Sequence, residues 1–405
     1  MSLNDTPSGE RTHIVFFGVR NAGKSSLVNA VTGQSTAVVS SAPGTTTDPV
    51  RKAMELLPAG PVLIVDTPGI DDEGDVGDLR VQRALTALDE ADVAVLVVDG
   101  TRGLSFFDEQ LVDAFRRREI PYVIAYNKAD LEEESGSLAA SLGNDEHGCR
   151  HARVRVSALT GKGVVDLKGV LAALIACTRD ERRLVADLLL PGDMVVLVIP
   201  LDSGAPKGRL ILPQQQVIRD VLSAGAFPCA TSVEGLPRLL ATLAQPPRLV
   251  VTDSQVFGAV DAALPPDVPL TSFSILMARY KGDLPAQLEA VRALENLTDQ
   301  DTVLIAEGCT HHRQCDDIGT VKLPEWIRQI SGANPQFAFT SGRDFPEDLS
   351  TYTAVVHCGG CTLNGREMAS RIERAQKQGV PITNYGMAIA RAHNILPRAL
   401  APLPR

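Results

Sequence analysis

Residues 18–25 form the stretch Gly18-Val-Arg-Asn-Ala-Gly-Lys-Ser25, which fits the pattern G-x-x-x-x-G-K-[ST]. The β-rich run Ile14–Gly18 precedes it and a helical pattern follows, as a phosphate-binding loop requires. Glycines let backbone amides approach phosphate oxygens, and the start of the helix adds a favourable dipole. Lys24 is expected to reach the β- and γ-phosphates of a nucleotide, and Ser25 to offer its hydroxyl to Mg²⁺. The predicted loop contacts are Gly18, Asn21, Gly23, Lys24, Ser25 and Ser26.

The pattern around this loop predicts a mainly parallel sheet. From His13 to about Cys177, short β-rich runs alternate with helical stretches, which is typical of an α/β domain with helices covering the sheet. The expected strands are Ile14–Gly18, Val62–Asp66, Val93–Asp99, Tyr122–Asn127 and Val154–Ser157.

Three further motifs follow expected strands. Asp66-Thr-Pro-Gly69 places a carboxylate for the metal shell and a glycine amide near the γ-phosphate. Asn127-Lys-Ala-Asp130 ends in a carboxylate that can accept hydrogen bonds from N1–H and the exocyclic amine of guanine, which adenine does not offer. Ser157-Ala-Leu159 is expected to close over the base. In order and spacing the set resembles the small GTPases, which adds these predicted nucleotide contacts: Asp66, Gly69, Asn127, Lys128, Asp130, Ser157 and Ala158.

Individual residues within these nucleotide motifs indicate which group of GTPases the chain resembles. Gly44-Thr-Thr-Thr-Asp48 resembles the first switch loop of the tRNA-modification and Era-like GTPases, with Thr46 as the second hydroxyl on Mg²⁺. Asn21 matches the asparagine that helps to hold K⁺ in that group, and a simple turn residue is the alternative. Ile70 stands where Ras-like enzymes carry a water-positioning glutamine, so we expect hydrolysis to be slow without K⁺, a dimer partner or another acid. Asp78 is a candidate for orienting water, against the alternative of a solvated acidic loop. The catalytic candidates are thus Lys24, Thr46 and Asp78.

Cysteines mark a second candidate site. Seven are present, an odd number, and four of them lie in the last hundred residues, which indicates metal or redox chemistry rather than a disulfide framework. Cys309-Thr-His311 follows the expected strand Val303–Ala306, and His357-Cys-Gly-Gly-Cys361 follows Ala354–Val356. If both strands are parallel, their carboxyl ends share one edge of a sheet, where α/β ligand sites form.

Three thiolates with nearby histidines are compatible with two kinds of metal site. Zinc with a Cys₃His set would be closed and structural, whereas an iron–sulfur cluster would leave one iron to an exchangeable ligand. A buried triplet without metal is a third alternative. The candidate ligands are Cys309, Cys358 and Cys361, with His311, His357 and Asp316 either as a fourth ligand or as residues that contact the ligands.

Length and composition limit the number of domains and the classes of binding partner. A chain of 405 residues suggests two or three domains, and a net charge of -10 argues against sequence-independent binding of nucleic acid. The longest apolar runs, such as Met194–Ile199, are too short to span a membrane. The N-terminus shows no export signal, so we expect a cytoplasmic protein. The predicted α/β architecture has a P-loop domain at 1–178, a small α+β middle domain at 182–266 and an α/β domain at 267–405.

The second and third domains are outlined by fewer signals. The charged stretch Thr178–Leu184 reads as a linker, followed by an expected strand at Met194–Pro200 and a helix from Val217. In the third domain the expected strands are Thr271–Leu276, Val303–Ala306, Phe337–Thr340, Ala354–Val356 and Ile382–Tyr385.

Over its whole length the chain resembles the GTPase of [FeFe]-hydrogenase maturation. The resemblance is carried by the Era-like motifs and by DSGAPKGRLILPQQQVIRD, EGCTHHRQCDDIGTVKLP and HCGGC. It implies a 4Fe–4S cluster on Cys309, Cys358 and Cys361, and a middle domain that pairs subunits into a homodimer. It also implies a scaffold that receives a di-iron precursor made with two radical-SAM maturases and delivers it to apo-[FeFe]-hydrogenase. GTP turnover would regulate these partner contacts.

Two alternatives belong to other functional classes. One is an Era-like GTPase that acts on RNA, against which the acidic balance and the lack of a basic, aromatic-rich C-terminal domain count. The other is a regulatory GTPase whose C-terminal zinc site is purely structural.

Overall fold

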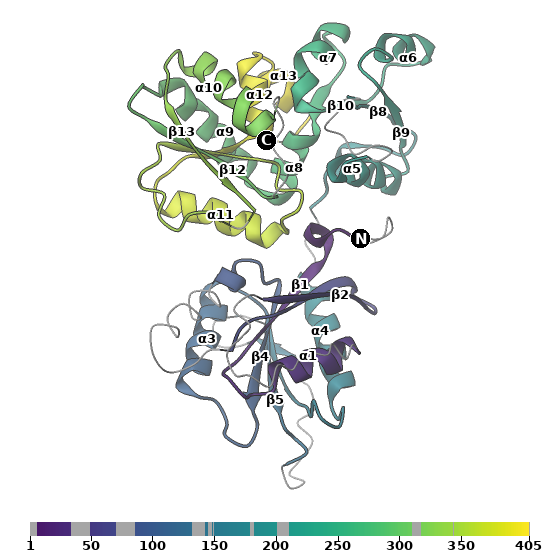
Figure 1. The fold of residues 1–405 in the computed structure, drawn as a ribbon. Coiled ribbons are helices and arrows are strands. Elements are labelled where there is room, and N and C mark those ends of the chain that lie inside the picture. Colours follow the sequence, from purple (N-terminus) through teal and green to yellow (C-terminus); the bar gives the residue numbers. More distant parts are fainter. Residues whose placement is uncertain are drawn as a thin grey trace. The chain divides into compact units, whose positions relative to one another are not determined.

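The chain forms two compact units, Met1–Asp180 and Glu181–Arg405, and each is described by itself (Figure 1). Four predicted site residues, Thr46, Asp78, His311 and Asp316, lie outside the residues that the structure describes. This computed structural model describes residues 6–33, 49–69, 86–131, 142–144, 148, 150–178, 182–200, 210–309, 317–342 and 344–404.

The first unit is built on a seven-stranded sheet in the order β2-β3-β1-β4-β5-β7-β6. The inner strands pair in parallel, whereas β2 and β6 pair antiparallel at the two edges. The predicted parallel α/β sheet is therefore confirmed for this unit. Its strands are β1 Thr12–Phe17, β2 Val50–Leu56, β3 Gly60–Asp66, β4 Val93–Asp99, β5 Tyr122–Asn127, β6 Gly143–Asn144 and β7 Arg150–Arg155.

Helices cover both faces of this sheet. Alternate residues of β1 point to opposite faces, with Ile14 and Phe16 in one core cluster and Val15 and Phe17 in the other. α1 and α4 pack on the first face and α3 on the second (Figure 1). Burial on both faces explains why the central strand β4 is apolar up to Asp99 at its carboxyl end. The helices are α1 Lys24–Thr32, α3 Phe106–Arg117 and α4 Val164–Thr178.

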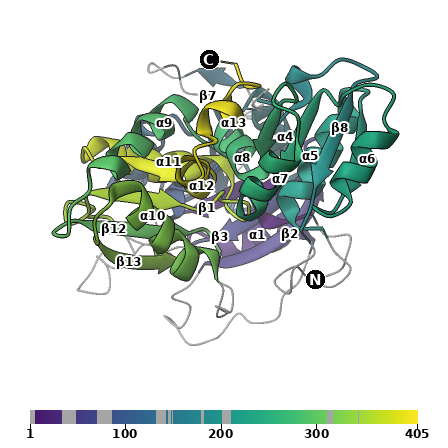
Figure 2. The same ribbon diagram turned by 90° about the horizontal axis from the view of Figure 1, so that it is seen from above.

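The second unit contains two four-stranded sheets, in the orders β11-β10-β8-β9 and β13-β12-β14-β15, and all their strand pairs are parallel. The first sheet lies at one end of the unit with α5 and α6, and the second lies at the other end (Figures 1 and 2). The strands are β8 Met194–Val198, β9 Phe227–Thr231, β10 Leu249–Thr252, β11 Leu270–Ser272, β12 Thr302–Glu307, β13 Gln336–Ser341, β14 Ala354–His357 and β15 Ile382–Asn384.

Helices alternate with these strands along the chain. They are α5 Leu212–Ser223, α6 Leu236–Thr242, α7 Phe257–Ala263, α8 Phe273–Lys281, α9 Leu284–Ala293, α10 Leu323–Ser331, α11 Gly365–Lys377, α12 Tyr385–Ala392 and α13 Leu396–Leu400. Because the middle sheet is wholly parallel and alternates with helices, the predicted α+β class of the middle domain is wrong, and α/β is correct. Its first helix starts at Leu212 rather than at Val217, since Pro213 is tolerated in a first helical turn.

The strand predicted at Thr271–Leu276 is also wrong in its second half. The strand ends at Ser272, whose hydroxyl accepts a hydrogen bond from the amide of Ile275 and so begins α8. Nearly all of residues 271–276 are buried, and a short buried segment does not distinguish a strand from a helix by periodicity. β11 pairs with β10, so residues 270–272 belong to the middle sheet. The division into domains at 182–266 and 267–405 stays a prediction.

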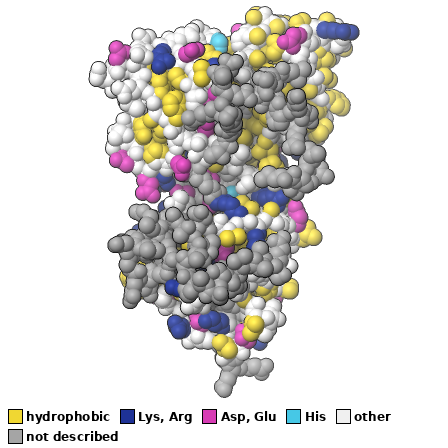
Figure 3. Space-filling view, in the orientation of Figure 1, with side chains coloured by type: hydrophobic (Ala, Val, Ile, Leu, Met, Phe, Trp, Pro, Cys, Tyr) yellow, Lys and Arg dark blue, Asp and Glu magenta, His cyan; other side chains and the backbone are white. Residues whose placement is uncertain are grey.

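One apolar core joins the middle sheet to later parts of the second unit. It combines residues of β8 and β10 with Leu276 and Met277 of α8 and Met387 of α12. Exposed apolar side chains of this unit include Leu222 and Phe227, and yellow side chains gather along its α6–β9 edge in Figure 3. Across the described parts of the chain, no helix is both long enough and apolar enough to cross a membrane.

Candidate functional sites

The phosphate-binding loop connects β1 to α1, which starts at Lys24. Gly18 has φ +151°, and a Cβ there would lie 2.4 Å from the carbonyl oxygen of Val97. At Gly23, φ is +83° and a Cβ would lie 2.2 Å from Nδ2 of Asn127. Both positions therefore require glycine. Asn21 is exposed with φ +65°, a left-handed conformation that asparagine tolerates, so its place in the turn has a local explanation and its predicted role with K⁺ stays a prediction.

One carboxylate holds the two residues predicted to meet the phosphates and Mg²⁺. Nζ of Lys24 lies 2.7 Å from Oδ1 of Asp66, and the hydroxyl of Ser25 donates to Oδ2 of Asp66 at 2.6 Å. Asp66 ends β3, the parallel neighbour of β1, so the sheet topology brings the loop and the carboxylate together. Gly69 follows close to the loop, since a Cβ there would lie 3.3 Å from Cα of Arg20. Ser26 is exposed in the first turn of α1.

Asn127 connects the phosphate-binding loop to residues 157–159, which are predicted to close over the base. Its side chain is buried, donates to the carbonyl oxygen of Ala22 at 2.9 Å, and accepts from the amide of Ala158 at 3.0 Å. Ser157 donates its hydroxyl to Oδ1 of Asp130 at 2.5 Å, which orients the predicted guanine-reading carboxylate. The structure therefore brings all the described residues of the predicted nucleotide site to the carboxyl ends of neighbouring strands.

Asp99, which the motif patterns missed, contacts a predicted site residue. It ends β4 and accepts a hydrogen bond from Nζ of Lys128 at 2.6 Å. Burial would raise the pKa of Asp99, but hydrogen bonds from Lys128 and Thr101 outweigh it and the pKa is lowered. The ion pair with Asp99 holds the side chain of Lys128, whose backbone has φ +65°. The available signal was an acidic residue at the end of a buried strand beside the strand that carries Asn127.

Gly23→Ala is expected to abolish measurable GTP binding, because the new Cβ must displace the Asn127 amide that bridges the two loops. Left-handed strain adds a cost of about 1–3 kcal/mol to the free energy of folding. Gly33→Ala is the matched control, since Gly33 has φ +65° but no atom lies within 4 Å of the position that a Cβ would take, so only the strain remains. Calorimetric titration with GTP measures the affinity of both variants, and urea unfolding measures their stability. Equal GTP affinities in Gly23→Ala and Gly33→Ala would contradict the predicted clash with Asn127.

The cysteine site lies at the carboxyl end of the last sheet. β12 and β14 are adjacent and parallel, Cys309 follows β12, and Cys358 follows β14 directly. The amides of Gly308 and Gly360 point at Sγ of Cys358 at 3.1 and 3.4 Å. Cys361 is partly buried against the shared apolar core of the second unit. The three thiols thus lie where the parallel strands end. We call residues 358–363 the cysteine loop.

Burial and mutual repulsion set the charge state of these thiols. Burial raises the pKa of Cys309 to about 12, and the neighbouring Cys358 and Cys361 add to that shift. Burial likewise raises the pKa of Cys358 to about 11, although the amides of Gly308 and Gly360 oppose it. The thiols therefore influence one another electrostatically and need positive charge to become thiolates. Within the described residues, no three Cys, His, Asp or Glu side chains form a group able to hold a metal ion.

His357 is held by both ring nitrogens. Arg371 donates to Nε2 at 3.0 Å, so Nδ1 carries the proton and donates to the carbonyl oxygen of Cys358 at 2.7 Å. Burial and the Arg371 charge lower the pKa of His357 to about 3, so the ring is neutral. Arg371 also donates to Glu367 and to the carbonyl oxygen of Gly342. In this arrangement His357 offers no free nitrogen to a metal, which favours contact with the ligands over direct ligation.

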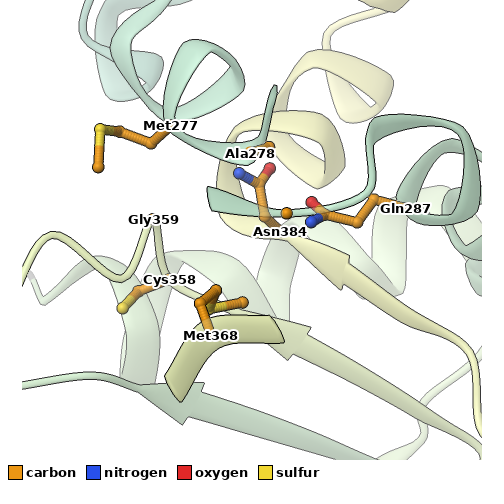
Figure 4. Close-up of a pocket in the computed structure, with 8 residues that line it drawn as sticks. Met277, Ala278, Gln287, Cys358, Gly359, Met368 and Asn384 are labelled. Atoms are coloured by element: carbon orange, nitrogen blue, oxygen red, sulfur yellow. The ribbon is translucent and has the colours of Figure 1, made fainter. Parts of the chain in front are cut away.

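A small cavity adjoins the cysteine loop. In Figure 4, Met277 and Ala278 of α8 lie on one side of it and Cys358 and Met368 on the other. Gln287 and Asn384 supply side-chain amides to its lining. α8 therefore lies directly beside the loop that carries two of the candidate ligands.

Family models match three segments of the chain. They are described as a 50S ribosome-binding GTPase, over residues 13–128, a hydrogen maturase F dimerization domain, over 184–282, and a hydrogen maturase F tetramerization domain, over 285–402. Together they cover the first unit from the phosphate-binding loop to Lys128 and nearly all of the second unit.

Curated relatives match in the first unit. The chain is 37% identical over 167 residues to the tRNA modification GTPase MnmE of Chromobacterium violaceum, covering 41% of this chain and 35% of that protein. It is 37% identical over 163 residues to MnmE of Laribacter hongkongensis, covering 40% of this chain and 34% of that protein. The chain thus spans about a third of the length of these relatives.

Solved structures that the chain matches include a probable GTP-binding protein EngB, at 24% identity and a TM-score of 0.31, covering 40% of this chain and 98% of that one. Another is Era of Aquifex aeolicus bound to GDP and AlF₄⁻, at 18% identity and a TM-score of 0.33. The match with Era covers 57% of this chain and 98% of that one.

Proposed function

We propose that the chain is a scaffold that carries a 4Fe–4S cluster and a di-iron cargo. The reason is that the chain belongs to the hydrogen maturase F family of hydrogenase maturation GTPases. In this proposal it holds the di-iron precursor of the hydrogenase active site and delivers it to apo-[FeFe]-hydrogenase. The observation that carries the proposal is the placement of Cys309 and Cys358 after the carboxyl ends of adjacent parallel strands, with Cys361 in the cysteine loop that begins at Cys358.

The first unit hydrolyses GTP, and its geometry supports the roles proposed for individual residues. Lys24 and Ser25 are held on Asp66 where the phosphates and Mg²⁺ are expected, so binding of the nucleotide exchanges these contacts for phosphate and metal contacts. Asp130 reads guanine in the orientation set by Ser157. We propose that hydrolysis is slow and stimulated by K⁺ at Asn21, since Ile70 replaces the water-positioning glutamine.

The donor set at the second site suits an iron–sulfur cluster. Three partly buried thiols are of the kind that ligates such clusters, and the amides of Gly308 and Gly360 are placed to stabilise negative charge on sulfur. Cys309, Cys358 and Cys361 would hold the cluster. Such a cluster would supply an iron that could take an exchangeable ligand, and so a place for a di-iron cargo with carbonyl and cyanide ligands. The candidates His311 and Asp316 remain proposals for contact with that iron.

Assembly of several copies is part of the proposal. The chain carries segments that match dimerization and tetramerization domains, which supports oligomerization. In the middle sheet β9 is an edge strand, and Phe227 at its start is exposed. Edge strands with unpaired backbone groups favour pairing with a second chain. We therefore propose a homodimer through the middle segment, which sedimentation equilibrium of the purified chain tests.

Partners outside the chain follow from the family. We propose that two radical-SAM maturases supply the cargo and that apo-[FeFe]-hydrogenase receives it. An RNA-directed GTPase is the alternative that the MnmE relatives suggest, but that similarity covers only the first unit. A regulatory GTPase with a structural zinc site is the other alternative.

The test is anaerobic reconstitution with iron and sulfide, followed by iron, sulfide and zinc analysis and electron paramagnetic resonance of the dithionite-reduced protein. We expect a reduced 4Fe–4S signal that disappears in Cys309→Ala. Stoichiometric zinc with no cluster signal would leave the GTPase in place and overturn the scaffold. Tight RNA binding that weakens steeply with salt would instead favour the RNA alternative.

A further inference from the structure

Helix α8 is attached at both ends to the sheet that carries the cysteines. Near its start, the amide of Asn384 donates to the carbonyl oxygen of Ser274 at 2.7 Å, and the backbone amide of Gly386 donates to the Ser274 hydroxyl at 3.2 Å. α8 itself falls within residues 184–282, the segment matched by the dimerization-domain model. The helix therefore connects the middle segment to the cysteine site by direct contacts.

Lys281, the last residue of α8, is only 3% exposed and reaches into the cysteine loop. Its Nζ donates to the carbonyl oxygens of Gly360 at 3.1 Å, Cys361 at 3.4 Å and Leu363 at 2.6 Å. An ammonium has three donors and no acceptor, so one buried side chain fixes three parts of a single turn. Burial of a lysine is costly unless such partners are present.

The same ammonium places a positive charge beside the thiols. Its Nζ lies 3.4 Å from the carbonyl oxygen of Cys361, so the charge sits within the loop that carries two of the candidate ligands. A cluster held by three thiolates would carry negative charge into this buried site, and its reduction by one electron would add one further negative charge. A fixed cation nearby therefore favours the bound and the reduced states.

We propose that Lys281 is a positioning residue that holds the cysteine loop in its ligand-presenting conformation and stabilises the negative charge of the bound cluster. Through α8, it couples the middle segment to that loop. The part concerning cluster charge rests on the proposed function, whereas the part concerning the loop does not.

The loop is tested first in the cluster-free full-length protein. Lys281→Met keeps the length of the side chain and removes its charge and donors. We expect iodoacetamide to alkylate Cys361 about tenfold faster than in the wild type, as read by mass spectrometry of the peptide, because the loop opens more often. Removal of a cation does not by itself make a neighbouring thiol more reactive, so faster labelling reports opening of the loop. A rate equal to or below that of the wild type would overturn the loop role.

Matched variants make this result specific. Lys377→Met removes an exposed lysine of α11, which pairs on the surface with Glu373, and is expected to leave the labelling rate unchanged. Lys281→Arg retains the charge and is expected to label more slowly than Lys281→Met. If Lys281→Met does not fold, as judged by circular dichroism, Lys281→Gln takes its place and faces the same comparison.

The charge is tested in the reconstituted protein by potentiometric titration followed by electron paramagnetic resonance. We expect the midpoint potential of Lys281→Met to shift to a more negative value and that of Lys281→Arg to stay near the wild type. Equal potentials in all three proteins would overturn the electrostatic role and leave only a structural one. If the wild type takes up no cluster, the proposed function fails, while the alkylation result still decides the loop role.

Discussion

Asp130→Asn is expected to lower the affinity for GTP by on the order of 100-fold, or about 3 kcal/mol, while the first unit stays folded. The carboxylate is the group that can accept from both N1–H and the exocyclic amine of guanine. Its orientation is set by the Ser157 hydroxyl, which donates to Oδ1 at 2.5 Å, and an asparagine oxygen can still accept this bond. The loss should therefore come from the base contact and not from collapse of the loop.

Two comparisons make the base-reading role of Asp130 specific. Xanthosine triphosphate carries a carbonyl in place of the guanine amine, so the amide of the Asp130→Asn variant can donate to it, and we expect this variant to prefer it to GTP. Ser157→Ala should lose about tenfold in GTP affinity, since it removes only the orienting bond. Isothermal titration with both nucleotides measures these affinities. An unchanged affinity for GTP in Asp130→Asn would mean that the base binds elsewhere.

Cys358→Ala is expected to abolish cluster loading while GTP hydrolysis stays at the wild-type rate. Two backbone amides, of Gly308 and Gly360, converge on Sγ of Cys358, so this sulfur is held in place at the end of β14. Hydrolysis should be spared because the nucleotide motifs lie in the other compact unit. Iron and sulfide content after reconstitution, together with phosphate release, measures both effects.

Cys229→Ala is the matched control for this cysteine. Cys229 lies in β9 of the same unit and is a partly buried free cysteine, so its replacement should leave iron content and hydrolysis unchanged. A full cluster content in Cys358→Ala would remove this thiolate from the ligand set. Loss of hydrolysis in that variant would show that the two units do not act independently.

The local motifs of the nucleotide site were predictable from sequence because each depends on a few adjacent residues. Gly18 and Gly23 are required by backbone conformations and by close approach of neighbouring atoms, which the loop pattern already implied. Asp66 and Asn127 each end a strand, and parallel strands bring such ends together. The same argument placed Cys309 and Cys358 at one edge of the last sheet.

Errors arose where local signals were ambiguous. The mostly buried segment after Thr271 is compatible with either a strand or a helix, and the N-terminal cap at Ser272, which starts α8, decides between them. The class of the middle domain depended on strand direction, which a single strand pattern does not contain. β11 joined the middle sheet through its pairing with β10, a contact that composition did not indicate.

The sequence by itself determined the nucleotide motifs, the parallel α/β character of the first unit and the cysteine pattern at a sheet edge. Only the tertiary structure decided that Asn127 bridges two loops, that Arg371 engages His357, and that Lys281 holds the cysteine loop. The physical reason is that motifs and periodicity record contacts between near neighbours in the chain. A buried cation or amide, in contrast, is satisfied by carbonyls that folding brings from distant segments, and no local pattern specifies those partners.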